Sequence, residues 1–156
     1  IMIQRIQSVF LFMAAAFAGV LFFVPIASFD HGTDFMNLSV YGVEPQVDAL
    51  YFGSTYALPL LVLAALMLLL PLVVIFLYKK RELQLKLSSL NVFLNAIFCG
   101  LIFLYYVSNV QETIAAEEVK YYFGTYVPLI NMVLSVLAMR WIRKDIELLK
   151  SVDRLR

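Results

Sequence analysis

Four long stretches without a charged residue constrain the fold of this chain more than any other feature. They cover residues 6–29, 49–78, 87–111 and 121–139, and the shortest contains 19 residues. A helix needs roughly 20 apolar residues to cross about 30 Å of hydrocarbon, so each stretch can span a bilayer. The composition agrees, because 63% of the residues are hydrophobic and only 15% are charged. We therefore predict an all-α membrane protein, a four-transmembrane-helix bundle forming a single domain over residues 1–156. The spans are expected near residues 8–28, 56–78, 88–108 and 122–140.

The basic residues predict the orientation of these spans. The N-terminus, the short loop at 79–86 and the C-terminal tail together hold 11 of the 12 Lys and Arg residues. The two other connections hold only Lys120, together with seven of the 11 acidic residues. Because Lys and Arg favour the cytoplasmic side, the pattern predicts a multi-pass protein with both termini in the cytoplasm. The first apolar run is too long for a typical cleaved signal peptide, so we expect it to remain as a span.

The largest connection on the outer side covers residues 30–55. It contains an alternating stretch at 35–41, between turn signals at Gly32 and Gly42. This pattern predicts a strand or a short β-hairpin lying on the outer ends of the helices. The second outer connection, 109–121, is acidic, and we expect it to carry a neighbouring helix past the membrane surface.

The third and fourth predicted helices carry a stripe of neutral polar side chains. The stripe consists of Ser88, Asn91 and Asn95 on the third helix, with Asn131 and Ser135 on the fourth. Spacings of three and four residues place each set on one helix face. Small and amide side chains join helices in lipid, so internal packing is one interpretation. The alternative is a polar site of a small transporter or ligand-binding membrane protein.

The C-terminal segment, residues 141–156, continues the fourth helix without Pro or Gly. Its charged side has acidic residues interleaved among the basic ones, and several apolar residues lie opposite. It can serve as a basic anchor, lie on the anionic inner leaflet, or dock on a protein partner. Mixed charge favours a protein partner over lipid alone. The predicted cytoplasmic contact surface consists of Gln4, Arg5, Gln7, Arg143, Lys144, Glu147, Lys150 and Arg154.

The chain lacks the residues that most membrane chemistry requires. A single cysteine, Cys99, cannot exchange disulfides internally, and the only histidine, His31, lies outside the predicted spans. The central spans contain no ionisable Asp, Glu, Lys, Arg or His, which argues against proton-coupled transport. Asp30, His31 and Asp34 could touch a metal ion, but that spacing is weak evidence for an enzyme. We predict no enzyme activity, no cofactor and no metal site, and a net charge of +1 indicates no nucleic-acid partner.

Motifs at the two ends of the chain carry a resemblance to a known family. The segment MIQRIQS at 2–8, and the segments IRKD at 142–145 and SVDRLR at 151–156, resemble small four-span bacterial inner-membrane proteins of unknown function. The resemblance implies a location in the bacterial inner (cytoplasmic) membrane and supplies no catalytic residue. It also implies that the distinctive motifs lie at the cytoplasmic ends. We therefore expect a non-enzymatic accessory subunit, surrounded by lipid and by other integral membrane subunits of a secretion, insertion or respiratory machine.

Overall fold

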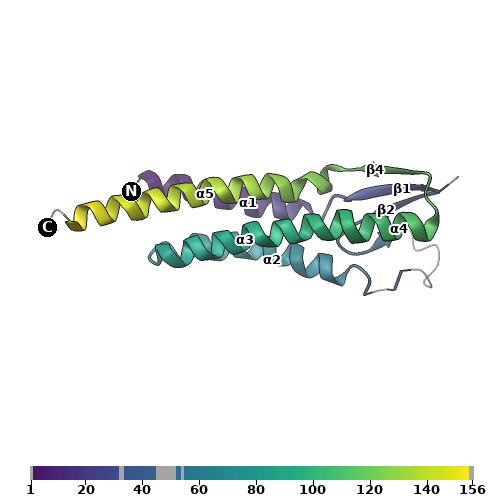
Figure 1. Cartoon of the computed structure of the whole chain (residues 1–156), viewed down its shortest axis with the longest axis horizontal. Coiled ribbons are helices and arrows are strands. Elements are labelled where there is room, and N and C mark those ends of the chain that lie inside the picture. Colours follow the sequence, from purple (N-terminus) through teal and green to yellow (C-terminus); the bar gives the residue numbers. More distant parts are fainter. Residues whose placement is uncertain (1, 32–33, 45–51, 54, 155–156) are drawn as a thin grey trace.

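The protein is elongated, with long helices along most of its length and a small sheet at one end (Figure 1). A computed structural model describes residues 2–31, 34–44, 52–53 and 55–154. Within these ranges, the side chains of residues 2–5, 31, 34, 153 and 154 lie outside the described part.

Four helical segments run side by side. They are α1 (Met2–Val20), α2 (Leu58–Phe76), the continuous rod formed by α3 (Arg81–Leu101), η1 (Ile102–Tyr106) and α4 (Val107–Ile114), and α5 (Phe123–Arg154). Both α1 and α3 pack mainly against α2 and α5. Figure 1 shows that α1 begins and α5 ends at the same end of the molecule as the turn between α2 and α3. We call this the turn end, and the opposite end the sheet end.

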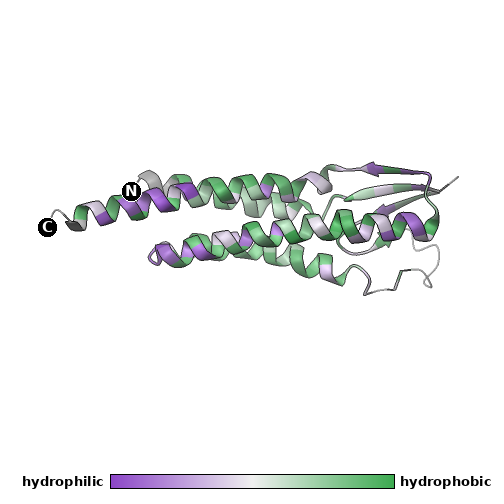
Figure 2. Cartoon of the chain, viewed as in Figure 1, coloured by the Kyte–Doolittle hydropathy of each residue, from purple (hydrophilic) through white to green (hydrophobic). Residues whose placement is uncertain are grey.

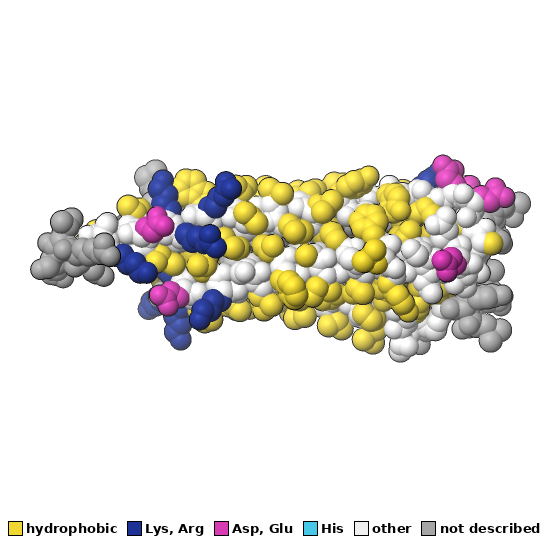
Figure 3. Space-filling model, viewed as in Figure 1, with side chains coloured by type: hydrophobic (Ala, Val, Ile, Leu, Met, Phe, Trp, Pro, Cys, Tyr) yellow, Lys and Arg dark blue, Asp and Glu magenta, His cyan; other side chains and the backbone are white. Residues whose placement is uncertain are grey.

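Three of these segments are long and apolar enough to cross a membrane. They are Leu58–Phe76, Arg81–Ile114 and Phe123–Val152, whereas α1 supplies a shorter apolar helix over Ile6–Val20. Hydrophobic residues dominate the middle of the helices, and polar residues gather toward the two ends (Figure 2). On the face drawn in Figure 3, Lys and Arg gather at the turn end, and acidic side chains are most evident at the sheet end. The structure therefore separates the charges as the sequence predicted, along a predominantly apolar surface.

The protein is mostly helical, as predicted, but it is not all-α, because a four-stranded sheet caps one end. Its strands are β1 (Ala27–His31), β2 (Asp34–Leu38), β3 (Val43–Glu44) and β4 (Glu118–Tyr121). All neighbours are antiparallel, in the order β3-β2-β1-β4. The β1–β2 pair is the hairpin expected from the outer connection. The strand β4 was not predicted, and it comes from the second outer connection.

The first predicted span, 8–28, is wrong at its C-terminal boundary. Helix α1 ends at Val20, and residues 27 and 28 belong to β1. Pro25 lies between them, and a proline without an N–H favours the change from helix to strand. Ile26, Ala27 and Phe29 come at the end of this uncharged stretch, and they are instead buried in and beside β1. Phe29, for example, is fully buried in the same cluster as Ile102 of η1.

The start of α5 fixes the sheet against the helices. The hydroxyl of Thr125 and the backbone N–H of Tyr122 both donate to the carbonyl of Ile26, at 2.5 and 2.9 Å. Gly124 lies so close that an added Cβ would be 2.6 Å from the backbone oxygen of Pro25. Only a glycine fits at this position in the first turn of α5, directly after β4.

The rod formed by α3, η1 and α4 extends beyond the predicted third span, residues 88–108. It ends at Ile114, so the helix continues into the connection at 109–121, as the sequence predicted. Ala115 follows in a left-handed conformation, with φ of 49°, and its N–H reaches the last carbonyls of α4. This left-handed residue ends the helix and turns the chain toward β4.

Candidate functional site

The candidate site is a polar core inside the helical part. Every one of the five stripe residues is buried, with at most 1% of its surface exposed: Ser88, Asn91 and Asn95 on α3, and Asn131 and Ser135 on α5. The structure places them on α3 and α5, which pack directly against each other. All five side chains therefore face the interior, which agrees with the packing interpretation and equally with a polar site.

Two hydrogen bonds hold the centre of this core. The side-chain amide of Asn91 donates to the hydroxyl of Ser135 at 2.9 Å, which joins α3 to α5. The amide of Asn95 donates to the backbone carbonyl of Asn91 at 2.7 Å, within α3. Only the first bond crosses between helices, so it is the direct polar link between these two segments of the stripe.

Several buried polar atoms of the core have no protein partner among the described residues. They include the side-chain oxygens of Ser88, Asn91 and Asn95, and both amide atoms of Asn131. An unpaired buried amide costs free energy, about 1–3 kcal/mol for each group. The core therefore has spare capacity to donate and accept hydrogen bonds, although its stripe residues carry no charge and are poor candidates for acid–base chemistry.

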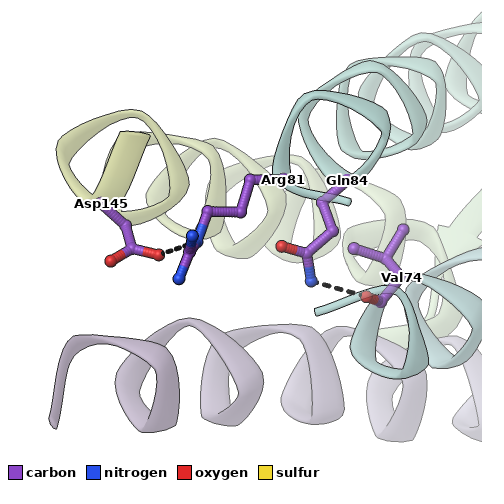
Figure 4. Close-up of polar contacts among 4 residues, drawn as sticks. All are labelled: Val74, Arg81, Gln84 and Asp145. Atoms are coloured by element: carbon purple, nitrogen blue, oxygen red, sulfur yellow. Dashed lines mark hydrogen bonds and ion pairs between the residues drawn. The ribbon is translucent and has the colours of Figure 1, made fainter. Parts of the chain in front are cut away.

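Two glutamines extend this core toward the turn end, and the sequence analysis did not place them there. Gln84 lies one helical turn before Ser88 on α3 and is 1% exposed, and Gln7 of α1 is equally buried. The amide of Gln84 donates to the carbonyl of Val74 in the last turn of α2, at 2.8 Å (Figure 4). The same carbonyl also accepts from the backbone N–H of Leu77 at 3.2 Å, so the Gln84 bond adds a contact between α3 and the end of α2. The four-residue spacing from Asn91 to Asn95, repeated backward from Ser88, could have revealed Gln84.

An ion pair closes the core at the turn end. Arg81, the first residue of α3, points toward Asp145 of α5 (Figure 4). The guanidinium Nε lies 2.5 Å from the carboxylate Oδ2, and the side chains are 25% and 13% exposed. The pair lacks the alignment of a hydrogen bond. In the sequence, Asp145 interrupts the apolar side of the C-terminal helix. A carboxylate on an apolar helix face indicates a cationic partner nearby, and here that partner is Arg81.

The predicted contact surface stays a prediction as a docking site, and the structure shows where its described residues lie. Arg143, Lys144, Glu147 and Lys150 are exposed on α5. Gln7 is wrong as a surface residue, because it faces the interior. The backbones of the other three place them at the turn end, and their side chains lie outside the described part: Gln4, Arg5 and Arg154.

The weaker metal or enzyme hypothesis rested on the β1–β2 hairpin. His31 and Asp34 are opposite each other in the strand register, and Asp30 precedes them on β1. The side chains of His31 and Asp34 lie outside the described part. Within the described part, no three His, Cys, Asp or Glu side chains group in a way that could hold a metal ion. The expectation that the protein binds no metal therefore stays a prediction.

These features define a predominantly helical protein with membrane-length apolar helices, a neutral polar core and a small terminal sheet. Residues 3–155 match the family described as Domain of unknown function (DUF4293), so the chain belongs to this family. The match covers nearly the whole chain and agrees with the resemblance to a family without an assigned function. No curated protein sequence matches the chain.

Proposed function

We propose that this protein is a non-enzymatic accessory subunit of a larger complex in the bacterial cytoplasmic membrane. It crosses the membrane four times, with both termini and the α2–α3 turn in the cytoplasm and the sheet on the outer side. The distribution of Lys and Arg supports this orientation. The docking surface is the exposed cytoplasmic part of α5 together with the start of α1.

The proposal counts α1 as the fourth span although its helix is short. The turn that follows Val20 is also apolar, so the uncharged stretch continues from Ile6 through Val24. Phe23 in this turn is 88% exposed, as expected for a side chain that meets lipid. A helix and turn of this length, roughly 28 Å if fully helical, match the hydrocarbon thickness.

The observation that carries the docking role is the uncovered end of α5. Every residue from Glu147 to Val152 is exposed, although this stretch forms the last turns of a long helix. Leu148, Leu149 and Val152 are 46%, 42% and 63% exposed, beside charges of both signs. Exposed apolar side chains on a charged helix are typical of a surface that a protein partner covers.

The test compares co-purification of partners from native membranes. We expect Leu148→Ala with Val152→Ala to release a stoichiometric membrane partner while the protein remains inserted. A chain ending at Ile146 should do the same, because it keeps Asp145 and its ion pair with Arg81.

The matched control removes exposed apolar area at the opposite end. Phe35 and Tyr41 near the sheet are 55% and 56% exposed, so Phe35→Ala with Tyr41→Ala should leave the partner bound. The proposal fails if both double variants retain the partner equally, or if wild-type protein purifies alone.

A second candidate is a small transporter or ligand-binding membrane protein that uses the polar core. The unpartnered amide of Asn131 and the oxygens of Asn91 and Asn95 favour it, because such groups can bind a polar solute. It predicts that Asn95→Leu abolishes binding or flux at unchanged expression. A variant that is merely less stable, with normal partner binding, points to helix packing instead.

A further inference from the structure

An open groove of about 520 Å³ lies at the turn end, outside the polar core. It is formed by the α2–α3 turn and the first turns of α3 on one side, and by α5 on the other. Five cationic side chains and a single carboxylate line it: Lys79, Lys80, Arg81, Lys86 and Lys150, with Glu82.

The charge of the groove is largely uncompensated by the protein. Arg81 is paired with Asp145, but no ion pair involves the four lysines within the described part of the chain. Lys79 lies above the ring of Tyr78, at 5.9 Å from its centroid. Cations gathered this closely favour an anion that brings several acceptor oxygens, as a phosphate does.

The groove also has an apolar part, which distinguishes it from a site for a free anion. Leu83, Ile146 and Leu149 line it together with the cations. Figure 3 shows basic side chains next to the apolar surface at this end of the molecule. A ligand that fits both parts has a charged head and a hydrophobic body.

A stripe of exposed apolar side chains leads from the groove along α3. The stripe consists of Leu83, Leu90, Phe93 and Ile97, at successive spacings of seven, three and four residues. Each of these side chains is at least 36% exposed. Leu83 to Ile97 spans about 21 Å at 1.5 Å per residue, somewhat more than the roughly 15 Å half-thickness of a hydrocarbon core. An acyl chain can therefore lie along α3 while its head group remains in the groove.

We propose that this groove binds the phosphate head group of an anionic phospholipid, with an acyl chain along the stripe on α3. The inference rests on the membrane insertion proposed above and is independent of any protein partner. Lys80 and Lys86 supply the positive charge at one wall of the groove and Lys150 at the other. The bound lipid bridges α3 and α5, and it shares Leu149 and Lys150 with the docking surface.

The test uses full-length protein in a neutral detergent, with native mass spectrometry after adding phosphatidylglycerol or phosphatidylcholine. Wild-type protein should retain phosphatidylglycerol in preference to phosphatidylcholine. Lys80→Gln with Lys86→Gln should weaken phosphatidylglycerol binding by about thirtyfold, the factor expected for removing two cations next to an anionic lipid surface. Both side chains are exposed, so the fold and melting temperature should be unchanged.

The control removes two charges at the same end but outside the groove. Arg140→Gln with Lys144→Gln lowers the net charge equally, and it should leave phosphatidylglycerol binding within about twofold of wild type. An equal loss in both double variants would mean general attraction to the basic end and would overturn the proposal. Equally tight binding of inorganic phosphate or glycerol phosphate would also overturn it, because neither carries an acyl chain. Since this readout needs no partner, it can succeed even if the accessory role fails.

Discussion

The hydrogen bond between Asn91 and Ser135 allows a direct test of what the polar core contributes. Ser135→Ala removes the hydroxyl that accepts from the Asn91 amide at 2.9 Å. Side-chain hydrogen bonds between membrane helices average about 0.6 kcal/mol and reach about 1.7 kcal/mol. The oxygen of Asn91 already lacks a protein partner, and its side chain is 1% exposed. The substitution therefore leaves the whole amide unpaired, and we expect a loss near the upper limit, about 1.5 kcal/mol.

The assay is reversible unfolding in mixed micelles, with the fraction of denaturing detergent as the variable. Ser89→Ala is the matched control, because Ser89 is exposed on α3, the helix that carries Asn91, and its loss should change the unfolding free energy by less than about 0.5 kcal/mol. Asn91→Leu combined with Ser135→Ala should recover most of the loss, since replacing both partners leaves no orphaned group.

Two results would refute this reasoning. If Ser135→Ala is no more destabilising than Ser89→Ala, the bond contributes nothing to the packing of α3 on α5. If the double variant is less stable than Ser135→Ala alone, Asn91 has a role beyond pairing with Ser135. The second result would strengthen the ligand-binding alternative, because the Asn91 oxygen has no protein partner.

Three further substitutions probe the fold, each by thermal unfolding in detergent. Gly124→Ala should destabilise by about 1–3 kcal/mol, because the new Cβ would lie 2.6 Å from the Pro25 backbone oxygen. Its control, Gly100→Ala, meets nothing within 4 Å in a helix interior and should stabilise by about 0.5–1 kcal/mol. Ala115→Gly should stabilise by about 0.5 kcal/mol by relieving left-handed strain, and an unchanged melting temperature would contradict that φ. Asp145→Asn should lower the unfolding free energy by about 1 kcal/mol, because it removes the charge that pairs with Arg81 at the start of α3. An unchanged unfolding free energy would show that the ion pair makes no net contribution to stability.

The sequence predicted the long helices well because a charge-free stretch of sufficient length is a local signal. It failed at the end of α1, where an apolar stretch continues without remaining helical. Residues 26–29 are at most 3% exposed in and beside β1, and a buried strand requires the same apolar side chains as a span. Hydropathy alone could not separate these two environments.

The sheet was only half predictable for a related reason. The β1–β2 hairpin forms between neighbours in sequence, and its turn residues are visible locally. The pairing of β1 with β4 places Ala27 opposite Tyr121, and no local sequence pattern in either segment predicts that they pair. Such a contact joins segments far apart in sequence, and it forms where the helices end next to the sheet.

The polar stripe was predictable because its spacing follows the helix repeat. The burial of Gln7 was not, because it stands among polar and charged residues at the chain start, where an exposed position is the ordinary expectation. Its side chain turns inward because α1 packs against both α2 and α5, which leaves an inner face even in its first turns.

The helical part differs from a water-soluble protein in where it places polar and apolar side chains. Several amides are buried within its largely apolar interior, whereas Phe76 and Leu104 are 80% and 83% exposed at the surface. In water that arrangement would expose a large apolar area and bury unpaired polar groups, and both cost free energy. In lipid the exposed side chains are solvated, and the interior amides can hold helices that hydrophobic attraction no longer brings together. The end of α5 fits neither environment alone, because Leu148 and Val152 are exposed beside charges. The proposed docking role would satisfy such a mixed surface at the boundary of the membrane, between lipid head groups and a partner protein.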